Sequence, residues 1–346
     1  MLIERVISSP DYDFVRTNDR LKGNIIFLAF GGSYAYGTNI EGSDIDIRGC
    51  ALNSKSDLLG FSNFEQYIDN KTDTVIYSFN KLVSLLLNCN PNVIELLGCR
   101  PDHYCMISKE GKQLIENRKL FLSQKAANSF GGYAIQQLRR LQNALARDSY
   151  PQTEKEKHIL GSCQSSLQSF HDRFEVIPEG SIRLKVGESK KEEFKSEIFV
   201  DVNLSHYPLR DFNGIISDMS SIIRNYEKLD ARNSKKDAVH INKHAMHLIR
   251  LYMMCLDILE KEEIVTYREK DRDFLLSIRN GAFMKEDGTY RPEFFELVNE
   301  YEKKLEYAKK NTSLPKDPDM RRVEEFVIGV NENIVRGEKY GGNDQR

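Results

Sequence analysis

The chain has 346 residues and 40% of them are hydrophobic, so two domains, each with its own core, are expected. Lys plus Arg total 50 and Asp plus Glu total 52, which gives a formal net charge of -2. This balance excludes a globally basic nucleic-acid-binding protein, although a local basic groove remains compatible with it.

Short apolar runs and scattered cysteines indicate the cellular setting. No apolar run is long enough to span a bilayer, and the N-terminus has no pattern typical of a secretory signal. The six cysteines include no CxxC pair, which favours reduced, buried thiols and no zinc site. We therefore expect a cytoplasmic protein without a membrane partner.

The first hundred residues carry three strand signals. Asn24–Phe30 is a nearly continuous apolar run, as in a strand buried on both faces, and a Gly31-Gly32-Ser33 break follows it. Asp44–Ala51 begins with strict alternation, and Asp73–Tyr77 is rich in β-branched and aromatic residues. These runs predict a small sheet.

Helical spacing of apolar residues dominates the rest of the chain, after two early helices that begin beyond Ser78 and at Pro91. The later predicted helices cover residues 108–117, 123–147, 209–228, 237–260, 271–279, 291–310 and 318–336. One exception is a predicted β-hairpin, in which Ser181–Val186 pairs with Glu197–Leu204. The pattern predicts an α+β protein, with an α/β domain over residues 1–105 and a mainly helical domain over residues 106–346.

The decisive motif combines Gly31-Gly32-Ser33 with Asp44-Ile45-Asp46, ten residues further on. Alternation along a strand places both aspartates, and Arg48 with them, on one face. Two carboxylates suit Mg²⁺, which needs only one or two and keeps phosphate and water oxygens as its other ligands. Paired glycines let the backbone approach phosphates closely, and Ser33 adds a hydroxyl donor. Each half alone is a common pattern, but the combination favours nucleotidyl transfer with two divalent ions.

The run GGSYAYGTNIEGSDIDIRG resembles the signature of the DNA polymerase beta nucleotidyltransferase superfamily. Within it, the chain is most similar to the RNA repair pathway DNA polymerase beta family, and NPNVIELLG, KHAMHLIRLY, LLSIRNG and SLPKDPD also look like segments of that family. The resemblance implies that the α/β domain has the polymerase-beta-like nucleotidyltransferase fold and that the enzyme uses an NTP. The family name suggests RNA ends as acceptors, although the superfamily also modifies antibiotics, proteins and nucleotides.

The same resemblance implies roles for individual residues. Gly32 and Ser33 are expected to contact the triphosphate, and Asp44 and Asp46 to bind both metal ions. A third carboxylate on a neighbouring strand is expected as a metal ligand and general base, and Asp73 is the first candidate. Its alternatives are Asp69 and Glu65, and a purely structural aspartate at the start of the strand is the competing interpretation.

Basic residues supply further candidates for contact with the NTP. On a continuous helix, Lys243, His247 and Arg250 lie at i, i+4 and i+7, which makes one cationic stripe that suits the β and γ phosphates. An ordinary solvated face is an equally good interpretation. Arg48 could contact a phosphate or form a salt bridge with the aspartates, and Tyr34 and Tyr36 could stack on a base but fit packing better.

These features predict a metal-dependent nucleotidyltransferase that moves a nucleoside monophosphate from an NTP, for example ATP, onto an acceptor hydroxyl. The expected cofactor is Mg²⁺, with Mn²⁺ as an alternative, and the expected acceptor is an RNA 3′ end, such as that of a tRNA. The competing hypotheses are transfer to a small molecule, nucleotide or protein, as in defence systems, and a non-catalytic nucleotide-binding module. The sequence does not indicate an oligomeric state.

Overall fold

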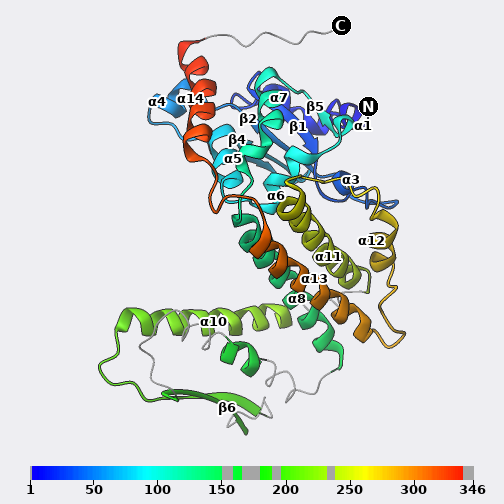
Figure 1. Ribbon diagram of the computed structural model, residues 1–346, viewed down its shortest axis with the longest axis vertical. Coiled ribbons are helices and arrows are strands. Elements are labelled where there is room, and N and C mark those ends of the chain that lie inside the picture. Colours follow the sequence, from blue (N-terminus) through cyan, green and yellow to red (C-terminus); the bar gives the residue numbers. More distant parts are fainter. Residues whose placement is uncertain (1, 150–158, 166–179, 189–195, 232–237, 338–346) are drawn as a thin grey trace. The chain divides into compact units, whose positions relative to one another are not determined.

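The computed structural model describes residues 2–149, 159–165, 180–188, 196–231 and 238–337. Contacts between Cα atoms divide the chain into two compact units. The first contains residues 1–139 and 242–346, and the second contains residues 140–241. The boundary predicted near residue 105 lies inside the first unit, which holds the sheet and the C-terminal helices together (Figure 1).

A five-stranded mixed sheet in the order β3-β4-β2-β1-β5 forms the centre of the first unit (Figure 1). Its strands are β1 (Ile25–Phe30), β2 (Ile47–Ala51), β3 (Gln66–Asp69), β4 (Thr74–Ser78) and β5 (Tyr104–Cys105). Only the β2–β4 pairing is parallel. The three predicted strands are present and are the three central ones, while β3 and β5 at the edges were not predicted.

Burial explains why β1 and β2 lie in the middle of the sheet. Every residue of β1 is buried, as its continuous apolar run predicts for a strand covered on both faces. Gly49 of β2 faces β1 so closely that a Cβ there would lie 2.7 Å from the Phe27 carbonyl oxygen. The β1–β2 pairing therefore depends on glycine at this position, and it fixes the strand that Asp46 precedes.

Short helices occupy the N-terminal part of the first unit: α1 (Leu2–Ile7), η1 (Pro10–Tyr12), α2 (Phe14–Thr17), α3 (Gly32–Tyr36), α4 (Lys55–Leu59), α5 (Phe79–Leu86), α6 (Pro91–Ile94), η2 (Glu95–Gly98) and η3 (Pro101–His103). The longer elements that follow are α7 (Lys109–Glu116), η4 (Arg118–Phe121), α8 (Lys125–Ser149), α11 (Ala238–Lys261), α12 (Arg272–Arg279), α13 (Pro292–Asn311) and α14 (Met320–Arg336). Each helix that helical spacing predicted in this unit is present, with ends that differ by no more than about two residues. None of the helices in the described ranges is both long and apolar enough to cross a membrane.

The second unit contains α10 (Leu209–Ala231) and a two-stranded antiparallel sheet. The sheet consists of β6 (Ile182–Glu188) and β7 (Ser196–Val202), paired from Ile182 with Val202 to Glu188 with Ser196. This pairing confirms the predicted hairpin. The charged residues 189–195 that join its strands lie outside the described part of the chain.

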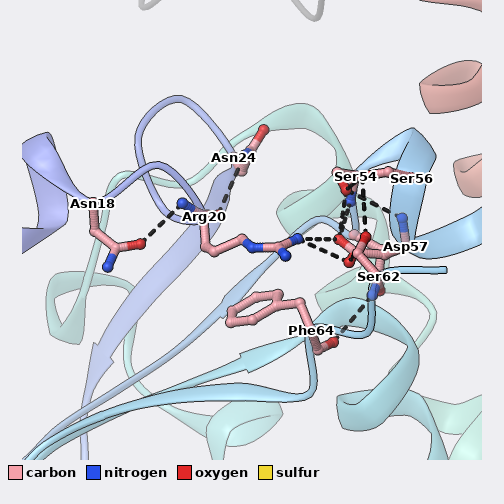
Figure 2. A network of polar contacts seen from close by, with 9 residues as sticks. Asn18, Arg20, Asn24, Ser54, Ser56, Asp57, Ser62 and Phe64 are labelled. Atoms are coloured by element: carbon pink, nitrogen blue, oxygen red, sulfur yellow. Dashed lines mark hydrogen bonds and ion pairs between the residues drawn. The ribbon is translucent and has the colours of Figure 1, made fainter. Parts of the chain in front are cut away.

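A buried carboxylate network anchors α4 to the segment that leads into β1 (Figure 2). The side chain of Asp57 is 2% exposed and accepts hydrogen bonds from Arg20 at 2.8 and 3.0 Å, from the Ser54 backbone at 2.9 Å and from Ser62 at 2.7 Å. Burial by itself raises the pKa of Asp57, but the hydrogen bonds from Ser54, Ser62 and Arg20 outweigh it and lower the pKa to about 2. The charged form is therefore the one that stabilises the fold.

Asp57→Asn should lower the free energy of unfolding at pH 7 by about 1–3 kcal/mol, because it weakens several hydrogen bonds to a buried charge. Since the folded pKa lies below the unfolded value of 3.8, the contribution is complete above that value and is lost as the pH falls through about 2. Urea unfolding at pH 7 and at pH 2–3 measures both effects. The control is Asp13→Asn, whose 63%-exposed side chain pairs with Arg16 and should matter by less than about 0.5 kcal/mol. Equal losses in the two variants would contradict the assignment.

Candidate nucleotidyltransferase site

Gly32 and Asp46 approach each other so closely that only glycine fits. Gly32 has φ +54°, and a Cβ on it would overlap Oδ2 of Asp46. A Cβ on Gly31 would lie 2.9 Å from Cγ of Arg48, and the Gly31 N–H donates to the Asp46 carbonyl at 2.9 Å. The turn after β1 is therefore pressed onto the residues that precede β2. The two halves of the motif, distant in sequence, form one site.

Asp46, Asp73 and Arg48 make a charged cluster beside this turn. Arg48 Nη2 lies 3.1 Å from Asp73 Oδ1 and 3.5 Å from Asp46 Oδ1, and Arg48 also donates to the Asp73 carbonyl. Burial raises the pKa of Asp46 to about 6, with help from a hydrogen bond that the protonated Asp46 donates to Asp73. The pKa of Asp73 is lowered by the same bond. The two carboxyl groups therefore share one proton below a pH of about 6, and both are ionised above it. Asp46, whose pKa is the higher, is the stronger base of the two.

Asp44 occupies a different position from the one predicted. Strand β2 begins at Ile47, so both aspartates of the motif lie before the strand and Asp44 is exposed in the loop after α3. No three His, Cys, Asp or Glu side chains of the described residues are placed to hold a metal ion together. The predicted set of Asp44, Asp46 and Asp73 is therefore only partly assembled, because sheet pairing does not fix the Asp44 side chain.

The donor chemistry of the Asp46–Asp73 pair nevertheless fits a divalent ion. Two carboxylates that share a proton occupy a place where a cation can replace that proton, and oxygen donors suit Mg²⁺. Near them, the exposed Lys243 of α11 is close enough for its charge to favour the ionised form of Asp46. Lys243 thus lies on the side of α11 where the cationic stripe was predicted.

The other two members of the stripe lie deeper in the protein. His247 is half-buried, and Arg250 is 1% exposed with its guanidinium 3.4 Å from the centre of the Tyr36 ring. Arg250 Nη2 donates to His247 Nδ1 at 2.9 Å, so this nitrogen carries no proton. Arg250 also has the Glu95 carboxylate at 3.8 Å, so its charge is already paired within the fold. We therefore assign it to the support of α3 instead of to the predicted NTP contact.

Arg250, Tyr36 and Glu95 form a buried network below α3. Glu95 is 5% exposed, accepts a hydrogen bond from the Tyr36 hydroxyl and lies 3.8 Å from Arg250. Burial raises the pKa of Glu95, although the charges of Arg250 and Arg48 oppose the shift. Tyr36 is therefore a packing residue, as the sequence favoured. Glu95 joins α3 to α11 through these contacts, and no periodicity in the sequence indicated this role.

The contacts of Asp69 and Glu65, the two alternatives to Asp73, and of Ser33 show which of these side chains are already engaged. Asp69 accepts from the Thr72 backbone at 2.8 Å, and Glu65 pairs with Lys81 at 3.1 Å, so both are engaged at the sheet edge. Ser33 lies in the first turn of α3, and its hydroxyl makes no hydrogen bond within the residues that the structure describes. This leaves the Ser33 hydroxyl able to donate to a ligand.

A glycine-rich turn at a helix start, set against a pair of aspartates, is the arrangement that the resemblance to polymerase-beta-like nucleotidyltransferases predicts. Residues 9–160 match the model of the RNA repair pathway DNA polymerase beta family, which confirms the resemblance over the segment that holds the site. This match covers less than half of the chain, and the later segments that resemble the family, KHAMHLIRLY among them, lie outside it. A comparison with curated proteins gave no match, and neither did one with solved structures.

The pKa of Asp46 offers a direct test of the carboxyl pair. Asp73→Asn replaces a charged acceptor with a neutral one, so the pKa of Asp46 should fall below about 6 but stay above 3.8, because burial remains. Arg48→Met removes a nearby positive charge and should raise it. Titration of the carboxyl carbon by NMR, without divalent ions, measures both shifts. An Asp46 pKa that is the same in both variants and the original protein would show that the pair does not interact.

The buried network predicts a large loss of stability when one charge is removed. Arg250→Met leaves Glu95 buried without its cation and should cost roughly 3–5 kcal/mol in unfolding free energy. Lys304→Met removes a cation that pairs with Glu300 at 2.6 Å, but on the surface, and should cost less than about 0.5 kcal/mol. Denaturant unfolding of the two variants measures the difference. Similar small losses would mean that Arg250 is not part of a buried ion pair.

Proposed function

We propose that the protein transfers a nucleoside monophosphate from an NTP to an acceptor hydroxyl, with an RNA 3′ end as acceptor, and releases pyrophosphate. The observation that carries this proposal is the close approach of Gly32 to the Asp46 carboxylate, with Asp73 and Arg48 beside it. The match of residues 9–160 to an RNA repair family supports the acceptor class.

The turn and its surroundings provide the groups that hold a triphosphate. Backbone N–H groups at the start of α3 and the Ser33 hydroxyl can donate to phosphate oxygens, and Gly32 lets the phosphates come close to the backbone. Lys243 contributes a positive charge near Asp46. Arg48 holds the two carboxyl groups in position through its ion pairs with both. These residues position the reactants, which is the main catalytic contribution in this chemistry.

In the reaction, the acceptor oxygen forms a bond to the α-phosphorus, and the bond from that phosphorus to the bridging oxygen breaks, so that pyrophosphate leaves. Mg²⁺ held by Asp46 and Asp73, with Asp44 as a further ligand, would neutralise the triphosphate charge and activate the attacking hydroxyl. The proton of that hydroxyl passes to the Asp46–Asp73 pair, which can accept it because both carboxylates are ionised above a pH of about 6. Asp73 thus serves as the base together with Asp46.

Activity is tested with each labelled NTP in turn, Mg²⁺ or Mn²⁺, and an RNA oligomer with a free 3′ hydroxyl. Asp44→Asn and Asp46→Asn should each reduce labelling of the RNA by about 100-fold or more, because each removes a charge from the reacting centre. The control is Asp102→Asn, since Asp102 is also an exposed aspartate paired with an arginine, Arg100 at 2.9 Å, and should leave the rate unchanged.

The other outcomes distinguish the competing hypotheses. The net charge of -2 is low for an RNA-binding protein and favours a different acceptor. Label on the protein, or pyrophosphate release without label on the RNA, would show such an acceptor. Saturable NTP binding without any turnover would instead indicate a non-catalytic module, and the transferase proposal would fail.

A further inference from the structure

Two arginines of helix α12 donate hydrogen bonds to the turn that follows α3. Arg272 and Arg279 are seven residues apart, so they lie on nearly the same face of the helix. Arg272 Nε donates to the Gly37 carbonyl at 2.8 Å, and Arg279 Nη1 donates to the next carbonyl, that of Thr38. These carbonyls are tied to the phosphate loop, the glycine-serine turn at residues 31–33, because the Thr38 N–H donates to the Ser33 carbonyl at 2.9 Å. Two hydrogen bonds therefore connect Arg279 with Ser33.

Arg279 differs from the other buried arginines of the described chain in its lack of a carboxylate partner. Arg268, 5% exposed, pairs with Asp257 and lies 2.7 Å from Asp271, and Arg250 lies 3.8 Å from Glu95. Arg279 is 9% exposed and has no ion pair with any described residue. Burying a charge without a counterion is costly, so this arrangement calls for an explanation.

Two polar atoms at this place are also left without partners. Arg279 Nε and Thr38 Oγ1 are both buried and make no hydrogen bond to any part of the chain that the structure describes. The Nε atoms of Arg250 and Arg268 are also unpartnered, so the missing carboxylate and the free Thr38 hydroxyl are what set Arg279 apart. Burial alone lowers the pKa of Arg279, with no carboxylate to oppose it. Arg279 is hydrogen-bonded to the Thr38 carbonyl, so two neighbouring residues beside the turn proposed to bind phosphates supply a cation, a free N–H donor and a free hydroxyl. Together they match the needs of an anion with several oxygens.

We propose that Arg279, together with Thr38 and Arg272, forms an anion subsite that receives a phosphate group of the substrate. The planar guanidinium can donate two parallel hydrogen bonds to phosphate oxygens, and the phosphate supplies the counterion that the protein lacks. The phosphate belongs either to the triphosphate or to the end of an RNA strand. The inference rests on the proposed function for its substrate class, but binding at the subsite needs no turnover.

A purely structural role is the alternative. Arginines can satisfy carbonyl groups at a helix C-terminus, and α3 ends at Tyr36 beside these carbonyls. The two roles predict opposite changes in stability. If Arg279 only caps α3, its removal destabilises the protein and leaves phosphate binding unchanged. If Arg279 binds an anion, its removal takes away an unpaired buried charge. The protein without bound anion then becomes no less stable, and phosphate binding weakens.

The test compares Arg279→Met with Arg268→Met, which removes a buried arginine that has its carboxylates. Tripolyphosphate binding is measured by calorimetry, and the melting temperature is measured in phosphate-free buffer of equal ionic strength. Arg279→Met should keep or raise the melting temperature and weaken binding by about tenfold or more. Arg268→Met should lower the melting temperature and change binding by less than about twofold. A lower melting temperature for Arg279→Met with unchanged binding would overturn the proposal in favour of capping.

Two further variants keep the test decisive. If Arg279→Met does not fold, Arg279→Lys and Arg272→Met take its place, because a lysine keeps the charge but loses the planar fork. Both should weaken tripolyphosphate binding, and unchanged binding in both would overturn the proposal. Asp46→Asn separates this inference from the proposed function, since it should abolish turnover without removing the effect of Arg279 on phosphate binding.

The source of the phosphate is found with RNA oligomers that are identical except for a 5′ phosphate, a 3′ phosphate or neither. If Arg279→Met weakens only tripolyphosphate binding, the subsite holds the NTP. In the original protein, a terminal phosphate is expected to increase the affinity for the RNA oligomer. If Arg279→Met reduces only this increase, the subsite holds the acceptor strand. If no probe distinguishes Arg279→Met from the original protein, no anion subsite exists there.

Discussion

The contact between Gly32 and the Asp46 carboxylate is the constraint on which the rest of the site depends. It brings a carboxylate within atomic contact of the turn that starts α3, and the first N–H groups of a helix have no partner inside that helix. The β1–β2 pairing holds this contact, because β1 leads into the turn and Asp46 leads into β2. A side chain at position 32 would force the two segments apart and separate the carboxylates from the phosphate loop.

The charged residues around this contact differ in how completely they are paired with opposite charges. Two of the three buried arginines in the described residues have carboxylate partners, since Arg250 has Glu95 and Arg268 has Asp257, and the buried Asp57 has Arg20. Charges near the glycine turn are less well neutralised. Asp46 and Asp73 have one arginine, Arg48, between them, Lys243 is exposed, and Arg279 is buried without a carboxylate among the described residues. Incomplete neutralisation costs stability, and it is expected where a charged ligand completes the set.

The sequence predicted the central strands and the long helices because their signals are local. The apolar run of β1 and the helical spacing of α11 depend on neighbours only a few residues away. The edge strands β3 and β5 escaped prediction because one is largely exposed and the other has two residues. Asp44 was placed in a strand because alternation begins before sheet pairing does.

The periodicity of the sequence predicts which residues share a helix face, but it does not predict how deeply each side chain is buried. Lys243, His247 and Arg250 share one face of α11, yet their exposure decreases along the helix until Arg250 is buried against Tyr36. For the same reason, the sequence did not single out Arg279 as a candidate site residue. Its burial arises from the packing of α12 on residues more than 200 positions earlier, which no local pattern encodes.

The central claim is that a divalent ion and an NTP bind together at the site formed by the glycine turn and the Asp46–Asp73 pair. The most direct measurement is the broadening of backbone amide NMR signals by Mn²⁺ in the presence of a non-hydrolysable NTP analogue. The account predicts that broadening is strongest at Gly31, Gly32, Asp46 and Asp73. Broadening centred elsewhere, for example at the surface hollow lined by Lys285, Asp287 and Glu293, would contradict it.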